Sequence, residues 1–554
     1  MIAANLLGVY FVDAGIKLFG PGIISKPTIS TIYTMNKISK LGALLAFCLM
    51  PALAYCQSTD AVIAGDNVAV TSTDNGQVRG YIHNGTYNYK GIPYATAKRF
   101  MAPEKPAPWQ GVRPSLVYGA VCPIDPTQTV NDPIEFGFQH NWGYMNEDCQ
   151  KLNIWTPGIN DQKKRPVMVW LHGGGFSAGS AIELLSYDGE NLSKKGDVVV
   201  VSINHRLNLL GFLNLSAYGD KYKSSANVGM MDIVAALQWV KQNIANFGGD
   251  PDNVTIFGQS GGGGKVTTLM AAPSAKGLFH KAIVQSGSYQ TKFMDNEVSK
   301  RIGAAMLETL NLQPNQVDSL QKIPYERLSA AAKKALPKVA QQLKAEGKPV
   351  AGFGLGWEPV NDGLFLPYQL NDAAAVELSK NIPLLVGSTK TEFMASLINP
   401  AIRNYTMDDV KKDLQKKYGD KADTYMAEVQ KAYPGTQKPS DYLDIDLATF
   451  RPGVIRQANG KSAVAGAAPV YMYMFTWASP VADGMFKSIH CIDICFEFDN
   501  IKRCEEMTGG GKDAYALAGK MSQAWVNFAR TGNPNAKGLP NWPAYTAQNG
   551  AAML

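Results

Sequence analysis

The sequence predicts a large α/β fold, and three observations support this. Residues 167–171 and 198–203 are continuous apolar runs of strand length, which is typical of parallel strands covered on both faces. Apolar residues recur at helical spacing between 230 and 244, and after Gly248-Gly249 a further strand-like run follows at 254–257. The chain has 554 residues, 45% apolar and 18% charged. This composition indicates a large core and excludes a disordered, collagen-like or coiled-coil protein.

The other elements follow in chain order. Residues 68–94 contain short β-rich runs separated by Asn75-Gly76 and Asn84-Gly85, which predict hairpins in an antiparallel starting sheet. Strands are expected at 382–386 and 470–477, and helices within 293–345 and 404–432. Because no repeat or Pro/Gly/Ser-rich linker interrupts this part of the chain, we expect one domain over residues 55–554.

The N-terminal region resembles a secretory signal placed too far into the chain. Lys37 and Lys40 precede the apolar run 41–50, and small residues at Ala52 and Ala54 provide a cleavage site. We expect a signal peptide over 35–54, cleavage after Ala54, and residues 1–34 as an extension upstream of the natural start at Met35. A membrane anchor within 1–54 is the weaker alternative, because no uncharged run of about 18 residues occurs there. The mature protein is therefore expected in the periplasm or outside the cell, without a membrane span.

The charge balance gives no indication of a polyanionic partner. The chain has 53 Lys and Arg against 46 Asp and Glu, a net charge of +7. Removal of residues 1–54 takes four Lys and one Asp, which leaves 7 − 3 = +4. Since no long basic run occurs, we expect no nucleic-acid partner.

A nucleophile motif follows the predicted strand 254–257. Gly258-Gln259-Ser260-Gly261-Gly262 matches G-x-S-x-G where a strand should turn into a helix, and Ser260 is the predicted nucleophile. A phosphate-binding loop ending at Gly264-Lys265 is the rival interpretation. It fails because Gln259 stands where the first Gly is required and Val266 has no hydroxyl for Mg²⁺.

A serine nucleophile needs a histidine base and an acid, which follow in the order Ser, acid, His in an α/β-hydrolase. Only His280 and His490 lie after Ser260. His280 follows too closely to leave room for an acid strand, so His490 is the predicted base. Glu392 is the favoured acid because it follows the expected strand 382–386 by a short loop, with Asp362 and Asp446 as alternatives.

Two further patterns concern the reacting site. His172-Gly173-Gly174-Gly175-Phe176 ends the strand 167–171 and has the composition of a loop whose backbone N–H groups stabilise an oxyanion. His490-Cys491 with Cys495 and Cys504 matches no zinc spacing, so no metal and no cofactor are expected. A Cys495–Cys504 disulfide and buried thiols both remain open.

Together these residues resemble the type B carboxylesterase family, which includes bacterial p-nitrobenzyl esterases, animal carboxylesterases and cholinesterases. The resemblance extends nearly end to end and implies the α/β-hydrolase fold, Ser260, Glu392 and His490 as the triad, and Gly174, Gly175 and Gly261 as oxyanion donors. It also implies a Cys122–Cys149 disulfide, since the separation of 149 − 122 = 27 matches the first disulfide loop of the family. Family-like blocks include Tyr89-Lys-Gly-Ile-Pro-Tyr94, Asn146-Glu-Asp-Cys149, Leu152-Asn-Ile-Trp-Thr-Pro157, Asn204-His-Arg-Leu207 and Phe247-Gly-Gly-Asp-Pro251.

The chain also departs from the family pattern. Gln259 and Gly261 replace the usual Glu and Ala beside the nucleophile, and Phe393 replaces a small residue after the acid. Gln139 stands where cholinesterases have a Trp, and Trp142 is out of register. Feruloyl esterases and tannases often carry Cys before the Ser and after the His, and only Cys491 is present here.

The sequence therefore predicts an exported serine carboxylesterase that acts on neutral small-molecule esters through an acyl-enzyme. An amidase, lactonase or carbamate hydrolase on the same fold is the first alternative. A non-catalytic binding relative is the second, although such a protein should lack the nucleophile or the His.

Overall fold

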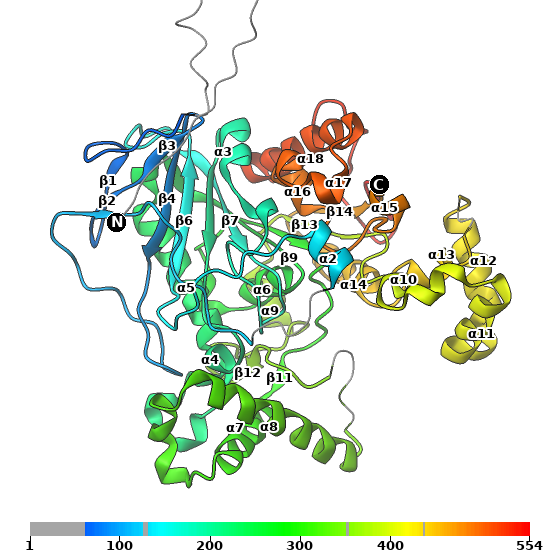
Figure 1. Ribbon diagram of the computed structural model, residues 1–554, viewed down its shortest axis with the longest axis horizontal. Coiled ribbons are helices and arrows are strands. Elements are labelled where there is room, and N and C mark those ends of the chain that lie inside the picture. The colour runs from blue at the N-terminus through cyan, green and yellow to red at the C-terminus, as the bar shows by residue number, and fades with distance from the viewer. Residues whose placement is uncertain (1–60, 126–130, 349, 351–353, 436–437) are drawn as a thin grey trace, which may run out of the picture. The chain divides into compact units, whose positions relative to one another are not determined.

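Nine strands form the central sheet of the computed structural model, which describes residues 61–125, 131–348, 350, 354–435 and 438–554 (Figure 1). The predicted signal peptide and upstream extension lie outside these residues, and Val62–Leu554 form one compact unit. The strand order is β14-β13-β10-β9-β7-β8-β6-β4-β3. The strands are β3 (Tyr81–His83), β4 (Thr86–Pro93), β6 (Lys151–Thr156), β7 (Arg165–Leu171), β8 (Val199–Ile203), β9 (Gly249–Gln259), β10 (Lys281–Gln285), β13 (Leu384–Thr389) and β14 (Val470–Phe475).

The sheet changes from antiparallel to parallel pairing along its width. All neighbours from β14 to β8 are parallel, whereas β8, β6, β4 and β3 pair antiparallel. The predicted hairpins are confirmed: β3 turns into β4 at Asn84-Gly85, and β1 (Val70–Thr73) turns into β2 (Gly76–Arg79) at Asp74-Asn75, one residue earlier than the predicted Asn75-Gly76. The second hairpin belongs to a separate sheet with β5 (Val112–Pro114).

Helices cover both faces of the parallel strands, as their continuous apolar runs predict. Alternate residues of β7 divide between two cores: Val167 and Val169 face one, and Met168 and Trp170 the other. On the first face lie α5 (Val228–Asn243), α6 (Gly261–Met270) and α14 (Phe450–Ser462); on the second lie α3 (Glu190–Gly196), α16 (Ile494–Glu497) and α18 (Lys512–Thr531). The predicted helix at 230–244 and the strands at 254–257, 382–386 and 470–477 are thus confirmed, with shifted ends.

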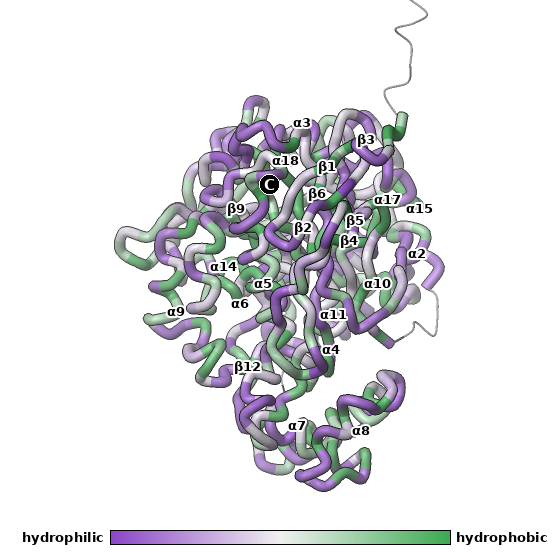
Figure 2. Tube along the Cα trace, turned by 90° about the vertical axis from the view of Figure 1, so that its left-hand side faces the viewer, coloured by the Kyte–Doolittle hydropathy of each residue, from purple (hydrophilic) through white to green (hydrophobic). Residues whose placement is uncertain are grey.

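The two predicted helical regions form satellite cores. Helices α7 (Asn296–Thr309) and α8 (Tyr325–Ala345) pack with α4 (Asn208–Phe212), and hydrophilic and hydrophobic residues alternate along them (Figure 2). A smaller cluster joins α11 (Met407–Tyr418), α12 (Ala422–Ala432) and α13 (Asp441–Asp444). The remaining helices are short: α2 (Asp132–Gly137), α9 (Ala373–Leu378), α10 (Ala395–Ile398), α15 (Val481–Gly484) and α17 (Glu505–Thr508), and β11 (Met294–Asp295) pairs with β12 (Val360–Asn361).

The predicted Cys122–Cys149 disulfide is wrong for this structure. Both residues are buried free thiols in the same apolar cluster. They are neighbours: a hydrogen bond with the Cys122 thiol, together with burial, raises the pKa of Cys149 well above its usual range. The Cys122 sulfur also accepts a hydrogen bond from the Leu207 amide at 3.2 Å. Apolar packing and these hydrogen bonds therefore bring the two ends of the loop together without a covalent bond.

No helix among the described residues is both long enough and apolar enough to cross a bilayer.

Candidate active site

Ser260 occupies the sharp turn between β9 and α6. Its φ of 57° and ψ of −124° lie in a region that residues with a side chain rarely adopt. Close backbone packing enforces this turn: a Cβ on Gly258 would lie 2.5 Å from the Leu171 carbonyl oxygen, and one on Gly262 only 1.9 Å from it. The two glycines therefore let the turn approach the end of β7, and Ser260 is left partly exposed at the carboxyl end of β9.

His490 and Glu392 come from loops at the same edge of the sheet. Glu392 follows β13 and His490 follows β14, and parallel strands present their carboxyl ends on one side. The Glu392 carboxylate accepts a hydrogen bond from His490 Nδ1, and the Glu392 carbonyl accepts one from the His490 amide at 3.1 Å. Both side chains are buried, so the carboxylate fixes the ring orientation.

The Glu392 carboxylate is itself held by two other groups. Its Oε1 accepts hydrogen bonds from the Ser286 hydroxyl at 2.7 Å and from the Thr389 amide at 2.9 Å. Glu392 has a φ of 43°, and its own amide donates to Thr389 Oγ1 at 3.1 Å. The loop is therefore a tight turn built to direct one carboxylate at the His490 ring.

The alternative acids and the alternative histidine have other partners. Asp362 Oδ1 accepts three successive backbone amides between 2.9 and 3.0 Å, and Asp446 accepts the amides at the start of α14. His280 Nδ1 accepts the Val254 amide at 3.1 Å, near the middle of β9 and away from Ser260. None of the three described side chains forms a hydrogen bond or ion pair with His490.

The charge on the His490 ring depends on its surroundings. Burial alone would lower the pKa of His490, but the Cys491 sulfur and the Glu392 carboxylate oppose it and hold this pKa well above the ordinary value. Behind Glu392, burial and the charge of Glu392 raise the pKa of Asp493 to about 6. These neighbours therefore favour the imidazolium that forms when the ring takes up a proton.

Gln259 makes a contact that sequence reasoning missed. Its Nε2 lies 3.2 Å from His490 Nε2 and 3.3 Å from His490 Nδ1, and its Oε1 accepts the Cys491 thiol at 3.2 Å. Between the described Ser260 and His490 side chains there is no hydrogen bond. Only the chain positions of Gln259 and Cys491, beside the nucleophile and the base, could have indicated this contact.

Two aromatic rings pack on His490. The Phe393 ring centroid lies 4.3 Å and the Phe450 centroid 5.1 Å from that of the imidazole. Phe393 is 54% exposed, so it forms part of the apolar surface around the base. The bulky Phe393 thus packs against the His490 ring without displacing the Glu392 carboxylate.

The glycine-rich loop lies directly against the nucleophile turn. Gly174 and Gly175 have φ values of 81° and 62°, and a Cβ on Gly173 would lie 3.6 Å from the Ser260 Cβ. A Cβ on Gly261 would fall 2.4 Å from the Gly175 nitrogen. The structure therefore brings the three predicted oxyanion donors, Gly174, Gly175 and Gly261, together beside Ser260.

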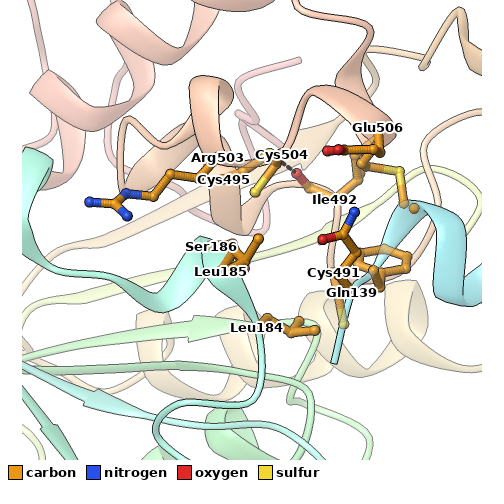
Figure 3. Close-up of a pocket in the computed structure, with 13 residues that line it drawn as sticks. Gln139, Leu184, Leu185, Ser186, Cys491, Ile492, Cys495, Arg503, Cys504 and Glu506 are labelled. Carbon is orange, nitrogen blue, oxygen red and sulfur yellow. Dashed lines mark hydrogen bonds between the residues drawn. The ribbon is translucent and has the colours of Figure 1, made fainter. Parts of the chain in front are cut away.

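Cys491 also lines a cavity (Figure 3). Gln139, Leu184, Cys495 and Cys504 line it. Cys495 and Cys504 are free thiols that contact each other. The sequence left a disulfide and free thiols open for this pair, and the structure contains the free thiols. Within the described ranges no cluster of His, Cys, Asp and Glu is arranged to hold a metal ion.

The fold and this set of side chains define a serine hydrolase of the α/β-hydrolase class. The pattern of the Carboxylesterase family matches residues 67–554, and the chain belongs to that family. It is a carboxylic-ester hydrolase.

Relatives of known name agree with this assignment. The chain is 36% identical to the para-nitrobenzyl esterase of Bacillus subtilis, over 88% of this chain and 94% of that protein. It is 33% identical to carboxylesterase 1E of Rattus norvegicus, over 84% and 85%. Among solved structures, an esterase of Clostridium hathewayi described as able to hydrolyse aliphatic aromatic polyesters has a TM-score of 0.76 at 38% identity, covering 88% of this chain and 93% of that one.

A first prediction concerns the space at Gly261. An alanine methyl there would meet the Gly175 backbone at 2.2–2.4 Å, so Gly261→Ala should push the glycine-rich loop away. We expect kcat to fall by about 10²-fold, the scale of losing one oxyanion donor, when ester hydrolysis is followed at saturating substrate. Gly460→Ala is the control, because a Cβ on Gly460 in α14 meets nothing within 4 Å. Equal kcat values for both variants would contradict the assignment of this loop.

Proposed function

We propose that the chain hydrolyses neutral carboxylic esters through an acyl-enzyme formed on Ser260. The hydrogen bond between Glu392 and His490, at the sheet edge that also carries Ser260, is the observation that supports this most directly. In this mechanism Ser260 Oγ attacks the ester carbonyl, and His490 Nε2 takes the hydroxyl proton. Glu392 keeps the proton of His490 on Nδ1 and stabilises the imidazolium.

The later steps follow from the same groups. The attack turns the carbonyl oxygen into an oxyanion facing the backbone N–H groups of Gly174, Gly175 and Gly261. The C=O bond then re-forms, the bond to the alcohol breaks, and His490 gives its proton to the leaving alcohol, which leaves the acyl group on Ser260. Water, deprotonated by His490, then cleaves the acyl-enzyme. Because Gln259 Nε2 lies 3.2 Å from His490 Nε2, it must yield this nitrogen to Ser260 when the proton is transferred. No cofactor enters the sequence of steps.

Single substitutions at the triad test the proposed roles. Ser260→Ala should keep the fold and lower kcat for a p-nitrophenyl ester by several orders of magnitude, and His490→Ala should match it, because triad members act as a unit. Glu392→Gln should retain more activity than either. Asp446→Asn is the comparison variant, since its carboxylate caps α14. If Asp446→Asn abolishes turnover and Glu392→Gln does not, the acid is misassigned.

The preference for neutral esters is proposed from charge and aromatic content. Gln259 places an uncharged amide beside Ser260 and His490, where the usual Glu of the family would attract a cation. Gln139, which lines the cavity beside Cys491, offers no ring to a quaternary ammonium group, and the nearby Trp142 stacks on His140 with a centroid separation of 5.0 Å. Both features disfavour choline esters.

A matched pair of substrates tests this preference. We expect 3,3-dimethylbutyl acetate to be hydrolysed with a higher kcat/KM than acetylcholine, since the two differ mainly in charge. Gln259→Glu should move the ratio toward acetylcholine, because its carboxylate would lie beside the leaving group. A wild-type preference for acetylcholine would overturn the proposal.

Export is proposed from the signal-like pattern at 35–54. The charged start, apolar run and small residues at Ala52 and Ala54 support cleavage after Ala54 and release into the periplasm or the medium. The intact mass of the protein recovered from the medium or periplasm tests this. We expect an N-terminus at Tyr55, and an N-terminus upstream of Met35 would contradict the proposal.

A further inference from the structure

Lys265 has a buried amino group that contacts the first residue of the glycine-rich loop. It lies on α6, five residues after Ser260, and its side chain is 0% exposed. Its Nζ donates a hydrogen bond of 2.8 Å to the carbonyl oxygen of His172, the residue that begins the loop. Burying an ammonium group is costly, so a Lys at this position requires a structural or functional explanation.

The carbonyl groups of this loop are anchored one after another. Lys265 holds the His172 carbonyl, His172 Nδ1 lies 2.9 Å from the Gly173 carbonyl oxygen, and the Gly174 carbonyl accepts the Ala178 amide at 2.9 Å. In a trans peptide the N–H points opposite to the preceding C=O. Fixing the Gly173 and Gly174 carbonyls therefore fixes the direction of the N–H groups of Gly174 and Gly175.

Lys265 holds the first of these anchored carbonyl groups, that of His172. The carbonyl it holds belongs to His172, whose ring in turn contacts the Gly173 carbonyl. The ring is also stacked on His205, with centroids 5.2 Å apart, and both imidazoles are buried. A shift of the His172 backbone would therefore displace its ring and, through the ring, the peptide that carries the Gly174 N–H.

We propose that Lys265 is a positioning residue, whose hydrogen bond to the His172 carbonyl aims the N–H groups of Gly174 and Gly175 at the oxyanion. This rests on the proposed function, because it assumes that these N–H groups meet a negatively charged oxygen. Lys265 itself does not touch the substrate. It acts through the backbone of His172.

The charge state of Lys265 is set by its neighbours. Burial lowers the pKa of Lys265 to about 7, against the attraction of Glu183. The facing groups are Glu183, in the segment after the loop, and the His172 and His205 rings, whose pKa values lie well below 6.5 because of burial and the Lys265 charge. Both the ammonium and the amine carry N–H groups, so the hydrogen bond to His172 persists on either side of this pKa.

Two variants and a matched control test the proposal. Lys265→Met removes the donor at similar volume, and Lys265→Gln keeps an N–H donor. Lys461→Met is the control, since Lys461 is also buried and donates to backbone carbonyls, those of Ser379 and Lys380, away from the loop. The measurements are kcat, KM, and the inhibition constant of a trifluoromethyl ketone, whose adduct with the serine carries an oxyanion.

We expect Lys265→Met to lower kcat by about 10- to 100-fold, which does not exceed the effect of removing a direct oxyanion donor. KM should change by less than about threefold. Ketone affinity should fall in parallel with kcat, and Lys265→Gln should retain more of both. Lys461→Met should leave kcat and ketone affinity unchanged. If Lys265→Met does not fold, Lys265→Leu, which also lacks a donor, decides: a kcat and a ketone affinity equal to wild type overturn the proposal.

A stability measurement checks the burial of the amine. Between pH 7 and 10 the unfolded chain holds the Lys265 proton and the folded chain releases it, so this residue makes the protein more stable as pH rises. The melting temperature of Lys265→Met should therefore rise less than that of wild type over this range. An identical rise would contradict the buried placement.

Ser260→Ala in the same series separates two failures. If Ser260→Ala still hydrolyses the ester, the proposed function is wrong. If Ser260→Ala is inactive while Lys265→Met keeps wild-type kcat and ketone affinity, only the role of Lys265 is wrong.

Discussion

At Ser260 the chain leaves β9 and enters α6 within one residue, while the turn packs against the carbonyl end of β7. The space is so small that a Cβ on Gly262 would lie 1.9 Å from the Leu171 oxygen. This contact fixes the position of the turn relative to the glycine-rich loop, because the loop begins at His172, the residue after Leu171. The positions of Ser260, the proposed nucleophile, and of Gly174 and Gly175, the proposed oxyanion donors, are thus set by one packing constraint. Glu392 and His490 are added from β13 and β14 at the same edge.

Three residues beside or near Ser260 make contacts that connect the site, and two of them, Gln259 and Gly261, depart from the family pattern. Gly261 leaves room for the Gly175 backbone, which lies where an alanine methyl would be. Gln259 places its amide on the His490 ring and joins it to Cys491. Lys265, in the middle of α6, donates a hydrogen bond to the His172 carbonyl. These contacts link the glycine-rich loop, the turn at Ser260 and the His490 ring to one another.

Much of the fold could be predicted from the sequence, because apolar periodicity and glycine turns report local structure. The parallel strands, the hairpins near Asn75-Gly76 and Asn84-Gly85, and helix α5 all follow from such patterns. The contacts of Gln259 and Lys265 could not, since they join residues far apart in the chain and depend on side-chain direction. Whether Cys122 and Cys149 form a disulfide could not be predicted either. Their spacing in the sequence suggests that the two sulfurs lie close together but does not decide whether they bond.

Covalent labelling tests the central claim, that Ser260 is a nucleophile activated by His490, most directly. An organophosphorus fluoride should add once to the native protein, with loss of fluoride, and peptide mapping by mass spectrometry should place the adduct on Ser260. His490→Ala should react far more slowly with the same reagent, because no base takes the hydroxyl proton. An adduct on another residue, or equal labelling rates for wild type and His490→Ala, would contradict the account.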